Sequence, residues 1–486
     1  MRRMLVLIVL AVAGASMPPA AAAECTPGEA GCMPSYERCA SGGGNGVWLG
    51  RNRGAATACV AAEGQIVAYA GGNPTYPCGT IAPAGFVLPG ADQDPNRCDT
   101  LAMPSNELRF RVQLPSDYET SGRAYPVLYL LPGGGGDENT WFEVMDVSAV
   151  ADQGLIVVSP HNGVGMYNDW RDGRYQLETL FVQSLVPHVD STYRTVAQRG
   201  HRAIAGFSQG GYGAMFLSAR HPELFAFAAS LSGVLDIRNP GWGPMASGLY
   251  SLDGGYDQPY SPSMPIFGDY VLDEVWWRDR NPLDLAANLR GTDIRTAVGN
   301  GIPAQHEASP LDVVFGSQPE MNLNQMQRDF VAALDAEGIG YHATEHDGGH
   351  LYQYGAEVLR EWVPHVLANL GRPDPAAFDY RTVEAHSSAW GWSFTADPAR
   401  APEFLEIRGA SSDGFHITGS GMTRVVTGRV AGPGATVEVT GAVEDLVVAD
   451  EEGRLHLTVD LGPPARIQQY RPGSVGQDLR TAKISF

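Results

Sequence analysis

The stretch RAIAGFSQGGYGAMFLSAR, residues 202–220, decides the fold of this chain. It opens with RAIAG, a short apolar run typical of a buried strand, and continues from Gln209 with the composition of a helix. The helix is expected to stop at His221 and Pro222, because proline cannot continue it. A strand, a tight turn and a helix in this order make up the repeating unit of a mostly parallel sheet.

The same unit recurs through the middle of the chain. LRFRVQLP (108–115) alternates apolar and polar residues, as a half-buried strand does. YPVLYLL (125–131) and LIVVS (155–159) are continuous apolar runs suited to strands covered on both faces, and QLETLFVQSLVPHV (176–189) is amphipathic. These stretches predict an α/β fold whose mostly parallel sheet carries helices on both faces.

The turn between the strand and the helix of the opening stretch holds G-x-S-x-G, with Ser208 at its centre. A serine in so tight a turn needs neighbours without side chains, and Gly206 and Gly210 supply them. The turn exposes the hydroxyl near the positive end of a helix dipole and leaves the Gln209 amide free to donate to an oxyanion. An ordinary tight turn is the alternative, but the flanking strand and helix favour a catalytic serine.

A serine nucleophile needs a base that is held by an acid, in the chain order Ser, acid, His. His350 follows a flexible Asp-Gly-Gly turn and opens a helix-like stretch, so its ring is expected to project over the edge of the sheet. His342 and His346 are expected to be surface or packing histidines.

The acid is expected in the loop after the strand IRTAVGN, residues 294–300. GIPAQHEASPLD follows this strand and places both Glu307 and Asp312 within reach. Glu345 and Asp347 lie too close to His350 along the chain to be the usual acid of a Ser-acid-His triad. The spacing along the sequence does not decide whether Glu307 or Asp312 is the acid. For either residue, the alternative interpretation is an ordinary surface carboxylate.

Four glycines, Gly133 to Gly136, follow the strand at 125–131. Without side chains, a backbone amide such as that of Gly134 can approach a substrate carbonyl and act as the second oxyanion donor. A phosphate-binding loop is the alternative, but no Lys-Ser/Thr pair follows the glycines. No cofactor is therefore predicted.

Acidic residues outnumber basic ones, 54 to 33, which gives a net charge of −21. The electrostatic field of this negative charge repels phosphate groups. We therefore expect no nucleic-acid partner and no binding to anionic membranes through net charge. With 44% hydrophobic residues, the chain is too apolar to be disordered. Its 486 residues predict roughly three domains, at about 150 residues each.

The first two dozen residues predict a secretory signal peptide, residues 1–23. Two arginines precede the apolar run LVLIVLAVAGA, and three alanines precede Glu24. A membrane anchor, or a lipoprotein signal ending at Cys25, is the alternative, but Glu24 fits lipidation poorly. We expect cleavage after Ala23 and a secreted product without stable membrane insertion, since no later run of ~18 apolar residues follows.

All six cysteines fall in residues 24–104, which are rich in Gly, Ala and Pro. An even number of cysteines in an exported chain predicts up to three disulfides and a loop-rich, stapled extension. Zinc is the alternative, but the segment holds no CxxC pair and no histidine, so no metal site is predicted. Spacing leaves the pairing open among Cys25, Cys32, Cys39, Cys59, Cys78 and Cys98.

The composition changes again after the catalytic core, which is expected over residues 105–370. A Pro-containing linker, residues 371–382, is followed by short alternating runs such as TRVVTGRVAG and RLHLTVDL. These runs predict an all-β, sandwich-like domain over residues 383–486. We expect this domain either to bind a polymer or to pack on the core.

Several segments resemble one known family. YPVLYLLPGGGG, AGFSQGGYGAMFLSARHPELFAFAASLSGVLD, WWRDRNPLDLAANL and GGHLYQYGAEVL together look like the esterase family of the α/β-hydrolase superfamily that includes esterase D and the secreted mycolyltransferases. The resemblance covers residues 105–370 and implies an α/β-hydrolase core with Ser208 as nucleophile and His350 as base. Mycolyltransferases carry a glutamate just after GNG-x-P, which implies Glu307 here, two residues displaced, with Asp312 as the alternative.

The same resemblance implies that Asp169 and Trp170, in YNDW, lie near the site and line an acyl or acceptor pocket. A structural loop is the other interpretation of these two residues. The glycine loop departs from the mycolyltransferases, which carry an Asp and an Arg there.

We expect a secreted serine esterase that hydrolyses small-molecule or polymer-linked carboxylic esters through an acyl-enzyme on Ser208. An acyltransferase that passes the acyl group to a sugar or glycerol hydroxyl is one alternative. A non-catalytic cell-wall or polymer-binding protein on a hydrolase scaffold is the other. The sequence leaves the oligomeric state open.

Overall fold

The computed structural model describes residues 106–161, 165–171, 173, 175–242, 266–307, 310–471, 473–474 and 479–486, and the backbone of strands at 47–49, 57–60, 66–70 and 96–103. The chain divides into two compact units, residues 1–102 and 103–486. The predicted signal peptide and the side chains of the six cysteines lie outside the described residues, so the disulfide prediction stays a prediction.

Residues 1–102 contain a small antiparallel sheet. It has the order β1-β2-β3, formed by β1 (Val47–Leu49), β2 (Thr57–Val60) and β3 (Ile66–Ala70). β4 (Asn96–Met103) crosses the boundary between the two units.

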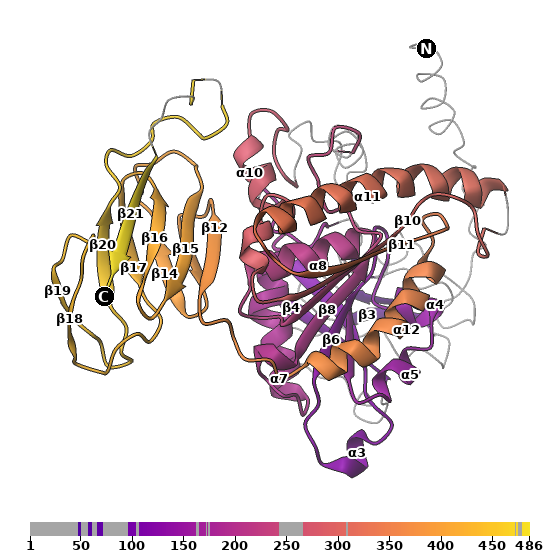
Figure 1. The fold of residues 1–486 in the computed structure, drawn as a ribbon. Coiled ribbons are helices and arrows are strands. Elements are labelled where there is room, and N and C mark those ends of the chain that lie inside the picture. Colours follow the sequence, from indigo (N-terminus) through magenta and orange to yellow (C-terminus); the bar gives the residue numbers. More distant parts are fainter. Residues whose placement is uncertain are drawn as a thin grey trace. The chain divides into compact units, whose positions relative to one another are not determined.

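The second unit is built on a sheet whose strands follow the order β11-β10-β9-β8-β6-β7-β5. Figure 1 labels β6, β8, β10 and β11 of this sheet. All neighbouring pairs are parallel except β5 with β7, which confirms the mostly parallel sheet. β6, β7, β8 and β9 are buried along their whole length, as their continuous apolar sequences predict. The strands are β5 (Asn106–Gln113), β6 (Val127–Leu131), β7 (Ile156–Pro160), β8 (Arg202–Phe207), β9 (Phe227–Leu231), β10 (Asp293–Gly299) and β11 (Tyr341–His346).

Helices connect these strands. One of them runs from α6 through a π-helical turn into α7. The elements are α3 (Tyr118–Ser121), α4 (Thr140–Val144), α5 (Val147–Ala151), α6 (Leu177–Leu180), η2 (Phe181–Leu185), α7 (Val186–Thr192), η3 (Arg199–His201), α8 (Gln209–Arg220), α10 (Glu274–Asp279), η4 (Ala286–Leu289), α11 (Pro310–Ala336) and α12 (Tyr352–Asn369). Among the described residues, no helix is long and apolar enough to cross a membrane.

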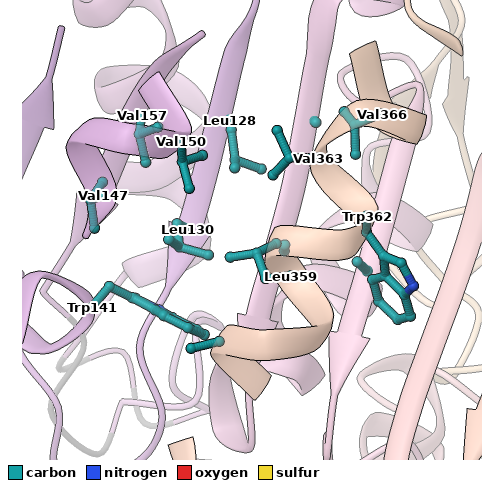
Figure 2. Close-up of a cluster of buried hydrophobic side chains, with 14 of the residues drawn as sticks. Leu128, Leu130, Trp141, Val147, Val150, Val157, Leu359, Trp362, Val363 and Val366 are labelled. Atoms are coloured by element: carbon teal, nitrogen blue, oxygen red, sulfur yellow. The ribbon is translucent and has the colours of Figure 1, made fainter. Parts of the chain in front are cut away.

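Both faces of the sheet carry a packed core, because successive side chains of a strand point to opposite faces. On one face, Leu130 of β6 packs near Leu359 of α12, within the cluster that α4 and α5 complete (Figure 2). Tyr129, the preceding residue, points the other way, where its ring contacts those of Phe181 and Phe225. This two-sided burial fixes the strand ends from which the site is built.

The C-terminal part is antiparallel. Two sheets, with the orders β12-β15-β16-β21 and β13-β14-β17-β20, share one buried apolar cluster, and β18 pairs with β19. β12 begins inside the segment 371–382 that was expected to be a linker, because its FDYRT sequence alternates and buries Phe378 and Tyr380 in that cluster. The strands are β12 (Phe378–Thr382), β13 (His386–Ala389), β14 (Trp392–Thr395), β15 (Leu405–Ser411), β16 (Gly414–Gly419), β17 (Met422–Val426), β18 (Thr436–Glu438), β19 (Leu446–Val448), β20 (His456–Asp460) and β21 (Arg480–Ser485).

A buried charge cluster joins the end of α8 to this C-terminal part. The Arg220 guanidinium contacts Glu178 of α6 at 3.0 Å and Asp279 of α10 at 2.8 Å. It also donates to the Thr382 hydroxyl at 3.2 Å and pairs with Glu384 at 3.2 Å. Burial of a guanidinium is costly unless its donors are satisfied. Residues of β12 and just beyond it therefore complete a site that residues 105–370 cannot complete by themselves.

Candidate active site

Ser208 occupies the sharp turn between β8 and α8. Its backbone has φ 55° and ψ −118°, a conformation that non-glycine residues rarely adopt. A Cβ on Gly206 would lie 2.3 Å from the backbone of Gly210, and one on Gly210 would lie 2.2 Å from a carbonyl oxygen of β6. Gly206 and Gly210, two positions on either side of Ser208, must therefore be glycine for the turn to close. This is the physical basis of the G-x-S-x-G pattern.

The imidazole of His350 connects Ser208 to a buried carboxylate. Its Nε2 lies 2.8 Å from Ser208 Oγ, and its Nδ1 lies 2.7 Å from Oε2 of Glu320. The serine follows β8, the histidine lies between β11 and α12, and the glutamate lies on α11, so three segments distant in sequence meet at one edge of the sheet. The Phe207 ring stacks on the imidazole at 4.7 Å between centroids and fixes its plane.

Glu320 is fully buried, and each of its carboxylate oxygens has a donor. Oε1 accepts hydrogen bonds from Ser232 Oγ at 2.6 Å and from the Gly299 amide at 2.6 Å. Oε2 faces the imidazole of His350. These donors compensate the desolvation of the carboxylate and hold it in one orientation.

The expected pairing of Glu307 with His350 is not what the structure shows. The Glu307 carboxylate accepts hydrogen bonds from the Gly349 amide at 2.5 Å, the Ala304 amide at 2.7 Å and the Tyr354 hydroxyl at 2.7 Å. Burial raises the pKa of Glu307, but these hydrogen bonds outweigh it and hold the pKa below its usual value. Glu307 thus clamps the loop that carries His350 and does not contact the ring.

The second acid candidate, Asp312, lies in the first turn of α11, and its side chain is outside the described residues. Sequence reasoning missed Glu320 because it searched the loop after β10 and not the helix beyond it. A signal was present: Glu320 shares the buried face of α11 with Leu323, Gln327 and Phe330, at helical spacing. A carboxylate on the buried stripe of a helix needs a partner.

Gly134 and Gln209, whose amides are the two predicted oxyanion donors, are in contact through the side chain of Gln209. A Cβ on Gly134 would lie 2.9 Å from Gln209 Oε1, so the Gln209 side chain fills the space above this glycine. The Gln209 amide opens α8 and has no carbonyl of its own helix to bond. The side-chain amide of Gln209 is buried, and its nitrogen and oxygen have no hydrogen-bond partner within the described part of the chain.

Three aromatic side chains hold the backbone that leads into the glycine loop. Each bonds a different main-chain group between the end of β6 and Gly133. Trp141 Nε1 donates to the Leu131 carbonyl at 3.0 Å, Tyr167 Oη donates to the Pro132 carbonyl at 2.7 Å, and Tyr352 Oη accepts from the Gly133 amide at 2.5 Å.

Asp169 and Trp170, the expected pocket residues, make structural contacts. Asp169 accepts hydrogen bonds from the Thr179 amide at 3.0 Å and the Thr179 hydroxyl at 2.6 Å, and burial raises its pKa. The Trp170 indole donates to the Gly165 carbonyl at 3.1 Å, and its ring packs edge-on against Tyr175. These contacts fit the alternative interpretation, a loop held at the start of α6.

The histidines that were expected to be packing residues contact aromatic rings. His346 stacks on Tyr354 at 5.1 Å, and His342 meets Trp362 edge-on at 6.4 Å between centroids. Within the described residues, no group of three His, Cys, Asp or Glu side chains is arranged to hold a metal ion. At this edge of the sheet, the serine hydroxyl, the imidazole and the buried carboxylate are groups suited to nucleophilic and acid–base chemistry.

Comparison with known proteins identifies chains that are similar in sequence or in fold. The Esterase family model matches residues 102–371. Esterase Rv1288 of Mycobacterium tuberculosis is 32% identical over 255 residues, which cover 50% of this chain and 52% of that protein, so the chain spans about half the length of the first curated relatives. Diacylglycerol acyltransferase/mycolyltransferase Ag85B of Mycobacterium intracellulare is 30% identical over 278 residues, covering 52% of this chain and 78% of Ag85B. Among solved structures, Mycobacterium tuberculosis MPT51 aligns with a TM-score of 0.47 and 22% identity, covering 57% of this chain and 99% of that chain.

Proposed function

We propose that this chain, which belongs to the Esterase family, is a secreted serine hydrolase. It cleaves carboxylic esters through an acyl-enzyme on Ser208. One observation carries the proposal. Ser208 Oγ, His350 and the Glu320 carboxylate form a continuous hydrogen-bonded chain, with distances of 2.8 Å and 2.7 Å. This is the arrangement that activates a serine hydroxyl.

In the proposed reaction, Ser208 Oγ attacks the ester carbonyl while its proton passes to Nε2 of His350. Glu320 accepts the Nδ1–H bond and stabilises the imidazolium that forms. The amides of Gly134 and Gln209 donate to the oxyanion. His350 then gives the proton to the leaving alcohol. In the second step the same imidazole takes a proton from water, which attacks the acyl carbon. The imidazolium returns that proton to Ser208 Oγ as its bond to the acyl carbon breaks, and the carboxylic acid is released.

An acyltransferase is the second candidate, because the chain covers 78% of a relative named as a diacylglycerol acyltransferase and mycolyltransferase. In this reaction a sugar or glycerol hydroxyl replaces water in the second step. Incubation with an activated ester and excess trehalose or glycerol separates the two candidates. Release of the free acid alone supports the hydrolase, and an acylated sugar or glycerol supports the transferase.

The nucleophile is tested by labelling with a fluorophosphonate. We expect one label per chain, no label on Ser208→Ala, and unchanged labelling of Ser218→Ala, a control at a buried serine of the same helix. Labelling that survives Ser208→Ala would overturn the assignment. Absence of labelling and of ester hydrolysis in the parent would favour a non-catalytic, polymer-binding protein.

Secretion and the division of the chain belong to the same proposal. Residues 1–23 would be removed on export, leaving the extension 24–104, the core 105–370 and the C-terminal β domain. The N-terminal sequence of the exported protein tests the cleavage site: a mature chain that begins at Glu24 supports it, and one that retains Met1 contradicts it. Small-molecule and polymer-linked esters are the proposed substrates.

A further inference from the structure

The segment that carries the catalytic base also reaches the oxyanion loop. His350 binds Ser208, and Tyr352, two residues later and the first residue of α12, accepts a hydrogen bond from the Gly133 amide at 2.5 Å. Gly133 directly precedes the proposed donor Gly134. One short stretch of chain therefore contacts both the nucleophile and the loop on the other side of it.

The position of the Tyr352 ring is strongly constrained. Its centroid lies 4.2 Å from that of Phe207, whose ring in turn stacks on His350. The Trp141 indole meets the Tyr352 ring edge-on at 5.4 Å. Because these two aromatic neighbours restrict the ring, the phenol oxygen is held at a fixed point beside the loop.

That fixed point lies where the loop and the nucleophile meet. A Cβ on Gly133 would lie 2.9 Å from the Tyr352 hydroxyl and 3.2 Å from Ser208 Cβ. The absence of a side chain on Gly133 allows the phenol, the loop and the serine to come this close. Four successive glycines have little conformational preference of their own, so the loop needs an external contact to hold its amides in place.

We propose that Tyr352 is a positioning residue: its hydroxyl fixes the Gly133 amide and thereby aims the Gly134 amide at the developing oxyanion. The inference rests on the proposed function, because it assigns the Gly134 amide to the oxyanion. Loss of a single oxyanion donor costs about 10² to 10³ in kcat in other serine hydrolases. A loop that is loosened but not removed should cost less than that.

The test is Tyr352→Phe, which removes the hydroxyl and keeps the ring stack. We expect kcat for a p-nitrophenyl ester to fall about 10- to 100-fold, as a fraction of that oxyanion effect. KM should stay within about twofold and the pH profile of kcat/KM should be unchanged, because His350 and Glu320 keep their contacts. The control is Tyr212→Phe, which removes a buried phenol bonded to the Arg280 carbonyl at 2.9 Å, away from the loop.

The outcomes separate the inference from the proposed function. A parent without esterase activity refutes the proposed function, whatever Tyr352 does. An active parent with Tyr352→Phe within twofold of it in kcat refutes the positioning role. An equal loss in Tyr212→Phe, or a shifted pH profile in Tyr352→Phe, also refutes it, because the cause would then be general destabilisation or displacement of His350. A selective fall in kcat, at unchanged thermal stability relative to the control, supports it.

Discussion

Replacing Glu320 with glutamine separates the two carboxylates that compete for the role of triad acid. The substitution keeps the size of the side chain and replaces one acceptor oxygen with an NH₂ donor. The Gly299 amide can only donate, so it retains the remaining oxygen at the position of Oε1. The new NH₂ group must then face Nδ1 of His350.

The size of the effect follows from the tautomer. An NH₂ group that donates to Nδ1 places the ring proton on Nε2, the atom that must accept the proton of Ser208 Oγ at 2.8 Å. In a serine protease the equivalent change, which fixes the wrong tautomer, lowers kcat about 10⁴-fold. We expect the same order for Glu320→Gln, which corresponds to about 5 kcal/mol in the activation free energy.

The assay is kcat for a p-nitrophenyl ester at neutral pH, with Glu307→Gln as the matched control. Glu307→Gln keeps one of the two acceptor oxygens, so at least one of the three hydrogen bonds remains, and the contacts of His350 with Ser208 and Glu320 stay intact. A loss of no more than about tenfold is therefore expected. Circular dichroism and thermal unfolding establish that both variants fold. The reasoning is refuted if Glu320→Gln retains more than a tenth of the parent kcat, or if Glu307→Gln loses as much as Glu320→Gln.

Three further predictions concern other parts of the site. Ser232→Ala removes one of two donors to Oε1 of the triad carboxylate, and we expect kcat to fall about tenfold, the equivalent of a hydrogen bond to a charged group; an unchanged kcat would show that this bond is dispensable. Gly210→Ala places a methyl group 2.2 Å from a backbone carbonyl, so the yield of folded protein should collapse, and a folded variant with parental thermal stability would contradict the packing argument. Burial raises the pKa of Glu138, but the Arg109 charge, the hydrogen bond with His161 and its charge, and a backbone hydrogen bond together outweigh burial and lower the pKa to about 2. Glu138 therefore stabilises the fold above its ordinary pKa of 4.5 and loses this effect as the pH falls towards 2; Glu138→Gln should flatten the fall in urea stability between pH 5 and pH 3, and an unaltered slope would exclude the contribution.

The serine and the histidine could be predicted because their signals are local. Gly206 and Gly210 indicate a tight turn at Ser208, because a side chain at either glycine would clash with the backbone. Asp-Gly-Gly before His350 indicates a flexible loop in front of a helix. In both cases the residues that shape the backbone lie within three positions of the functional side chain. The mostly parallel sheet could be predicted for a related reason, since strands buried on both faces must be apolar throughout.

The acid could not be found by the same reasoning. The helical spacing of buried residues on α11 indicates that Glu320 is buried, but its contact with His350 depends on how that helix packs across the sheet, which this spacing does not encode. Glu307 gave a misleading signal because it does lie beside the histidine loop, where it bonds the backbone and not the ring. Asp169 accepts hydrogen bonds from the amide and the hydroxyl of Thr179, and its predicted place in a substrate pocket stays a prediction.

The cluster around Arg220 has a consequence for the order of events during synthesis. Glu384, one of its partners, lies 164 residues later in the chain. At about 5 to 20 residues per second, roughly 8 to 30 seconds separate the emergence of the guanidinium from that of its last partner. During this interval the strand and helix that present the nucleophile can form, but the far end of the helix holds a cation whose partners are incomplete. The buried site around Arg220 in a nascent chain is therefore completed only after ribosomes have added Glu384, two residues beyond β12.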